Sequence, residues 1–158
     1  MSEKIWLLKA SIQESIHKIE EAYLSLGRVE LANLDADRSI IVSYYLHVIY
    51  GHFENLFTRI ASAFENQIED KSQWHSELLW RMTINIQGIR PAVISKESQL
   101  YLDELRRFRH LFRNAYLLRF DPDRLALVLR DARHLEARYQ SELADFIAFL
   151  DVLLEEDH

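Results

Sequence analysis

Residues 35–64 read DADRSIIVSYYLHVIYGHFENLFTRIASAF and carry the clearest helical pattern of the chain. Its apolar side chains recur every three or four residues, which is the spacing of one face of an α-helix. Asp35 or Asp37 can cap the start of this helix. Gly51 lies inside it at a cost of about 1 kcal/mol relative to alanine, so we expect close backbone packing or a bend there. The predicted apolar face consists of Ile41, Tyr44, Val48, Phe53, Leu56, Ile60 and Phe64.

The same periodicity predicts helices on both sides of this stretch. A first helix runs from Ile5 to Leu26 and ends at Gly27. Ser72 is expected to cap a short third helix over residues 74–82. The segment QGIRP at 87–91 then ends the helical pattern, because a proline disfavours helical geometry in the residue before it.

Two further helices are predicted in the second half of the chain. Ser95 caps a fourth helix, whose buried stripe is Leu105, Phe108, Phe112 and Ala115. Asp121 followed by Pro122 is typical of a helix start, and the fifth helix is predicted to continue without a break to Leu153. No run alternates as a strand would. We therefore predict an all-α fold, a four-helix up-and-down bundle with one short additional helix, in a single domain over residues 1–158.

Composition excludes several classes of protein. The 158 residues contain no cysteine, so there is no disulfide framework, thiol nucleophile or cysteine-zinc site. The longest stretch without a formal charge, residues 39–53, is too short to span a bilayer. The charged start MSEKIW is followed by no apolar signal region, so we expect no signal peptide. Glu14 and His17 fit one Glu-x-x-His of a di-iron site, but such a site needs a second copy and two more glutamates, which we do not find. We expect a soluble cytoplasmic protein with no metal, no cofactor and no membrane partner.

Arginine is concentrated in one window of an otherwise acidic chain. The net charge is −6, yet residues 105–120 contain no Asp or Glu and five arginines: Arg106, Arg107, Arg109, Arg113 and Arg119. At 100° per residue, Arg106, Arg109, His110 and Arg113 share about 100° of the fourth helix, away from its apolar stripe. Such a cluster either binds an anion or forms ion pairs with acids on the first, second or fifth helix.

Within this window, the sequence RHLFRNAY at 109–116 resembles the Arg-x4-6-His signature of HEPN domains. It is more closely similar to the Arg-x4-His-x-Tyr form of the HepT toxins. The flanking segments WHSELL (74–79), RPAVIS (90–95), YLDEL (101–105) and FDPDRL (120–125) also resemble a HepT-like subfamily, in order and with similar spacing.

The resemblance implies a HEPN bundle that forms a homodimer about the motif helix. It also implies a toxin that cleaves RNA without a metal and is silenced by a partner nucleotidyltransferase, an MntA-like antitoxin, which adds AMP to the motif tyrosine. By position, Arg109 is the motif arginine and Tyr116 the AMP acceptor. Asn114 stands where the motif histidine is expected.

An asparagine cannot titrate near neutral pH, so proton transfer needs another group. His110 is the candidate for this role, with Asn114 orienting it. Arg109 and Arg113 would bind the scissile phosphate, and Arg106 would contribute to substrate binding.

Four other positions near the motif have two interpretations each. Trp74 and His75 can add a stacking plane and a second imidazole to the cleft, or Trp74 can simply lock the start of its helix. Glu54 can hold an arginine of the fourth helix, or be an ordinary surface glutamate. Tyr50 is expected in the core or at a dimer seam.

Three hypotheses follow for the function. The first is a HepT-like endoribonuclease acting on cellular RNA, tRNA included. The second is a binding module for a nucleotide, RNA or partner protein, in which Asn114 records the loss of cleavage. The third is a structural helical dimer whose arginines are paired internally.

Overall fold

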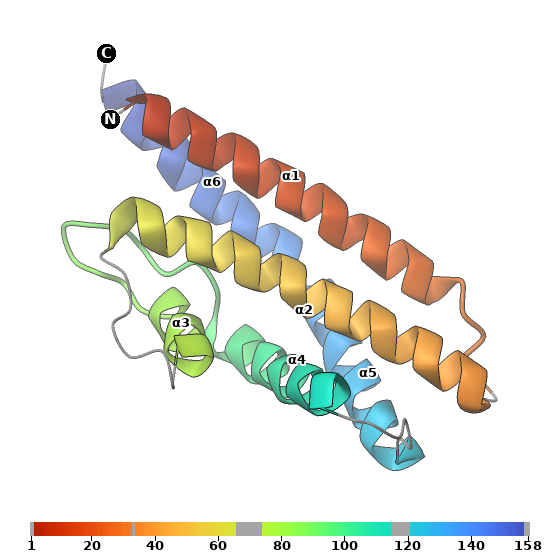
Figure 1. Ribbon diagram of the computed structural model, residues 1–158. Coiled ribbons are helices and arrows are strands. Elements are labelled where there is room, and N and C mark those ends of the chain that lie inside the picture. The colour runs from red at the N-terminus through yellow and green to blue at the C-terminus, as the bar shows by residue number, and fades with distance from the viewer. Residues whose placement is uncertain (1, 33, 66–73, 115–120, 157–158) are drawn as a thin grey trace.

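The computed structural model describes residues 2–32, 34–65, 74–114 and 121–156, and for residues 112–114 it describes the backbone only. These residues form helices and no β-strand, apart from one isolated bridge between Ile86 and Arg90 (Figure 1). This confirms the all-α prediction. The helices are α1 (Ser2–Gly27), α2 (Ala36–Phe64), α3 (Trp74–Met82), α4 (Lys96–Asn114), α5 (Pro122–Glu136) and α6 (Tyr139–Glu156).

Helix α2 is the centre of the bundle. It packs against α1 on one side and against α3, α4 and α5 on the other, while α6 lies along α1. Figure 1 shows the long helices alternating in direction, with both ends of the chain at the same end of the bundle. In the part of the chain that the structure describes, no helix combines the length and apolarity that a membrane span requires.

The predicted helix starts are confirmed where the structure describes them. The carboxylate of Asp35 accepts a hydrogen bond from the backbone N–H of Arg38, and Asp121 does the same for Asp123. The hydroxyl of Ser95 accepts from the N–H of Ser98 at 3.1 Å. These contacts satisfy backbone donors that have no partner within the helix. Ser72, the predicted cap of α3, lies outside the described residues.

The prediction of one unbroken fifth helix is wrong, because a break at Ala137 and Arg138 separates α5 from α6. The N–H of Arg138 bonds to the carbonyl of Leu135 at 3.0 Å, a tighter turn than an α-helix makes. The two halves pack against different neighbours, α5 mainly on α4 and α6 mainly on α1. Just after the break, the Tyr139 ring fits between Tyr23 and Phe53. Tertiary packing therefore breaks a segment that contains no glycine, and no proline after Pro122, to end a helix there.

The apolar face of α2 differs from the prediction in its first turns. Ile41 and Tyr44 are 44% and 53% exposed, whereas Val42, Leu46 and Ile49 are fully buried. From Phe53 onward the predicted face is largely correct, and it continues into a core that joins all six helices. The first turns of α2 contain more apolar residues than one face of a helix can hold. The sequence therefore does not show which of these residues point toward the core.

The segment between α3 and α4 is fixed by a buried arginine. The side chain of Arg90 is completely buried and forms an ion pair with Glu65, at the end of α2. The Nε of Arg90 donates to Glu65 at 2.6 Å, and its other nitrogens donate to the carbonyls of Arg81, Ile84 and Pro91. Because Glu65 also pairs with Arg81 of α3, this one carboxylate holds α3 against α2.

Gly51 does not make the close backbone contact that its position predicts. A Cβ atom added there would meet no described atom within 4 Å, and the glycine sits in the middle of α2. Gly51→Ala should therefore raise the free energy of unfolding by about 0.5–1 kcal/mol, because alanine loses less backbone entropy in a helix. The melting temperature should rise by about 2–4 °C.

Gly88→Ala is the matched control, because this glycine also has open space but sits at a φ of +79° in the turn before Arg90. We expect Gly88→Ala to destabilise by about 1 kcal/mol, since an L-residue is strained in that conformation. A loss of stability in Gly51→Ala would contradict the prediction.

Candidate functional site

Glu54 of α2 joins two side chains from two other helices. One of its carboxylate oxygens, Oε1, lies 3.0 Å from Nη1 of Arg109 on α4. The other, Oε2, lies 2.6 Å from Nδ1 of His75 on α3. The Glu54 side chain is only 14% exposed, so both contacts form in a partly dehydrated place where charge pairing is stronger than at the surface. We call Glu54, His75 and Arg109 the Glu54 cluster.

Tyr50 forms the floor of the Glu54 cluster. It lies one turn before Glu54 on the same face of α2, and the guanidinium carbon of Arg109 is 5.6 Å from the centre of its ring. Burial, and then the nearby Glu54 carboxylate, raise the pKa of Tyr50 far above the ordinary value, so its phenol stays protonated. The prediction that Tyr50 belongs to the core is confirmed, but its contact with Arg109 was missed. The i, i+4 spacing of Tyr50 and Glu54 was the signal for it.

His75 is the exposed member of the Glu54 cluster, with 48% of its side chain accessible. Its Nδ1 faces Glu54, which fixes the orientation of the ring and directs Nε2 away from the carboxylate. Trp74 makes an edge contact with the His75 ring at 4.8 Å and is itself packed against the core. Trp74 therefore helps to anchor the start of α3 while its ring stays beside His75, and these two contacts are compatible with either of its interpretations.

The remaining described arginines of α4 pair with carboxylates of the same helix. Arg106 contacts Asp103 at 2.8 Å, and Arg107 contacts Asp103 at 3.0 Å and Glu104 at 3.7 Å. These contacts agree with the interpretation that the arginines of this helix form ion pairs within the chain. The carboxylate partners lie on α4 itself, whereas we expected them on the first, second or fifth helix. Arg106 still borders the Glu54 cluster, because its charge acts on Tyr50.

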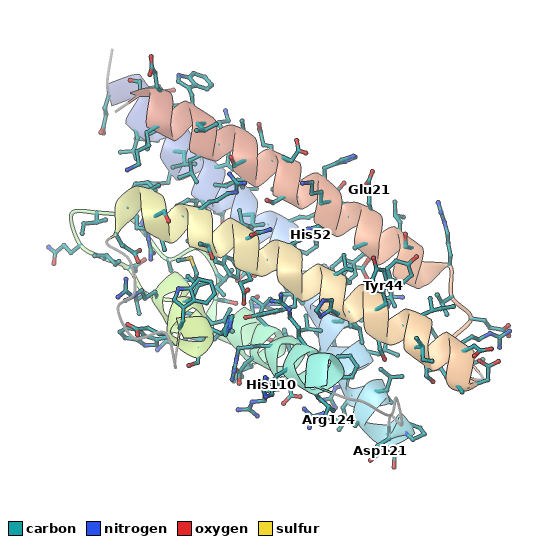
Figure 2. The ribbon with its side chains drawn as sticks, in the orientation of Figure 1. Glu21, Tyr44, His52, His110, Asp121 and Arg124 are labelled. Atoms are coloured by element: carbon teal, nitrogen blue, oxygen red, sulfur yellow. The ribbon has the colours of Figure 1, made fainter. Side chains whose placement is uncertain are left out.

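His110 lies apart from the Glu54 cluster. It is exposed, and Figure 2 shows it at the edge of α4 away from α2. The structure thus brings Arg109 together with His75, whereas the sequence alone placed it with His110. For Arg113 and Asn114 only the backbone is described, as the last residues of α4, and Tyr116 lies outside the described residues.

The described residues contain no group of three or more histidine, aspartate or glutamate side chains that could hold a metal ion. His17, considered for a di-iron motif, instead lies 3.1 Å from Glu21 on the same exposed face of α1. The chemistry available at the Glu54 cluster is therefore a guanidinium, an imidazole and the carboxylate between them.

Glu54 links the arginine-rich helix α4 to α3 within an all-α bundle, and this architecture is consistent with a HEPN-like bundle. A family model described as HepT-like protein matches residues 41–150, from the second turn of α2 into α6. The chain belongs to this HepT-like family. The match contains all three members of the Glu54 cluster. No curated protein and no solved structure matches the chain significantly.

Proposed function

We propose that this protein is a HepT-like toxin, an endoribonuclease that cleaves cellular RNA, tRNA included, without a metal ion. Family membership supports a HEPN-type module of this general kind. The observation that carries the proposal is the Glu54 cluster, which sets the motif arginine and a histidine on the two oxygens of one carboxylate. RNA cleavage requires a cation for the phosphate and a group that moves protons, and these two side chains supply both.

Arg109 makes fewer hydrogen bonds within the described chain than the buried Arg90. Arg90 directs its guanidinium to Glu65 and to three backbone carbonyls. Arg109 contacts Glu54 through Nη1, and its buried Nε has no hydrogen-bond partner among the described residues. Its side chain is 20% exposed, and we expect a phosphate to reach Arg109 on that exposed side rather than at Nε.

The other residues near the motif take the following proposed roles. Arg113 shares the phosphate with Arg109, and Arg106 and Trp74 bind further along the RNA. His75 and His110 are the two groups able to move protons, and Asn114 orients them. Tyr116 accepts AMP from a nucleotidyltransferase antitoxin. We also propose a homodimer about α4, a cytoplasmic location and one domain over residues 1–158. The continuous core from Ile5 to Leu154 supports the single domain.

A second candidate function is binding of a nucleotide, RNA or partner protein without cleavage. Two observations favour it. Asn114 occupies the position of the motif histidine. In addition, Arg106, Arg107 and Arg109 each have a carboxylate partner within the chain, which lowers the positive potential available to RNA.

One experiment separates the two functions. Purified protein is incubated with total RNA in EDTA, beside the variant Asn114→His. We expect wild-type protein to cleave RNA in EDTA and Asn114→His to cleave it faster, because a histidine at this position adds a titratable group. An inert wild type with an active Asn114→His variant would overturn the ribonuclease proposal and support binding alone.

A further inference from the structure

A groove of about 320 Å³ lies between α1 and α2, and the proposed function does not use it. Figure 2 shows His52 where these two helices meet, on the far side of α2 from His110. At 100° per residue, His52 lies about 160° and Arg59 about 140° from Glu54 around α2, so both are on the other side of the helix. The groove and the Glu54 cluster are therefore separate places, and neither proposal depends on the other.

Small side chains on α1 create the groove. Ala10, Ser11 and Ser15 line it, and none of them reaches far toward α2. The opposite wall consists of His52, Asn55 and Arg59, which are longer and polar. Most of these lining residues are exposed, so the groove opens to solvent. Its lining consists largely of hydrogen-bonding groups, so it suits a polar ligand.

Cationic groups outnumber anionic groups around the groove. Lys18 and Arg59 are positive, and Glu14 is the one carboxylate among the described lining residues. Glu14 is 70% exposed and lies 3.8 Å from Lys18, the outer limit of an ion pair. A pair this long and this exposed contributes little, so both partners can rearrange around a ligand.

Arg59 differs from nearly all other arginines of the described chain. Its guanidinium contacts the Ser11 hydroxyl at 3.5 Å, and no described carboxylate lies within salt-bridge distance of it. Apart from Arg28, every other arginine whose side chain is described pairs with a carboxylate. Arg59 can therefore bind an external anion without first breaking an ion pair within the described chain.

His52 lines the groove from α2, and Lys18 lines it from α1. Burial lowers the pKa of His52, and the charge of Lys18 lowers it further. The imidazole is therefore neutral at pH 7 and can donate one hydrogen bond from the wall of the groove.

We propose that this groove binds a phosphate group, carried by a free nucleotide or by an RNA strand. Arg59 and Lys18 would neutralise the charge of the phosphate. Ser11 and Asn55 would complete its hydrogen bonds, because both can donate and both line the groove.

The test follows the His52 imidazole by NMR during titration with inorganic phosphate, with 5′-AMP and with a ten-nucleotide RNA, each at matched ionic strength. We expect at least one of these probes to shift the His52 signals with saturation and to raise the pKa of the ring. If phosphate or 5′-AMP saturates the shift of the His52 signals, the groove is a site for a nucleotide. If the RNA binds tenfold more tightly than these two probes, the groove binds an RNA strand.

Arg59→Gln should weaken this binding about tenfold, because it removes a charge-assisted contact to the phosphate. Arg28→Gln is the matched control, since Arg28 is the other exposed described arginine without a carboxylate partner, and binding should not change. The proposal is overturned if no probe shifts His52, or if Arg59→Gln and Arg28→Gln affect binding equally.

Discussion

Glu65→Ala is expected to lower the free energy of unfolding by about 3–5 kcal/mol, because it leaves the buried Arg90 guanidinium without its counter-charge. Arg90 has no exposed side-chain surface and Glu65 has 7%. The backbone carbonyls around Arg90 satisfy hydrogen bonds but carry only partial charges. The melting temperature should fall by roughly 10–15 °C, measured by circular dichroism.

Glu77→Ala is the control for this prediction. Glu77 also pairs with Arg81, at 3.3 Å, but its side chain is 34% exposed, so its loss should cost less than about 0.5 kcal/mol. The double variant Glu65→Leu, Arg90→Met should recover only part of the lost stability, since it removes the unpaired buried charge but leaves the carbonyls of Arg81, Ile84 and Pro91 without their donor. A cost below about 1 kcal/mol for Glu65→Ala would show that Arg90 is not held by this pair.

Arg109→Ala is expected to reduce RNA cleavage by about 10²–10³-fold, the usual cost of removing a charge that stabilises a transition state. Arg107→Ala is the matched control, because Arg107 lies on the same helix, is 59% exposed and pairs with Asp103 rather than with the Glu54 cluster. Initial cleavage rates in EDTA check the prediction, with thermal melting to show that each variant is folded. Equal rates for the two variants would exclude Arg109 from the chemistry.

His75→Gln should reduce cleavage about a hundredfold, since general acid–base groups contribute on this scale. His17→Gln removes a comparable histidine–glutamate pair on α1 and should have no effect. Glu54→Gln tests the positioning role, because an amide cannot hold a guanidinium and an imidazole as strongly as a carboxylate does. We expect a loss of up to a hundredfold and a changed pH profile, whereas a merely structural role would change stability alone.

The helix boundaries could be predicted where a local signal marks them. Asp35, Ser95 and the Asp121-Pro122 pair each act within three or four residues, so the sequence shows them directly. The break at Ala137 and Arg138 has no such signal. It arises because α5 and α6 pack on different helices.

The candidate site was predictable in part. The sequence identified Arg109 and His75, and it named Glu54 as a possible partner for an arginine of the fourth helix. It did not show that both side chains meet on this one carboxylate, because the three residues lie on three helices. The sequence also placed His110 beside Arg109, because neighbouring residues of a helix differ by only 100° around its axis. In the structure this angle is enough for Arg109 to face α2 while His110 is exposed.

The all-α class, the helix starts at Asp35, Ser95 and Asp121, the arginine-rich helix and the resemblance to HepT-like proteins could be predicted, because each depends on local spacing. Which side chains share a carboxylate, which face of α2 turns inward and where the last predicted helix breaks became visible in the folded chain. Those outcomes depend on contacts between residues far apart in the chain, and helical periodicity holds no information about them.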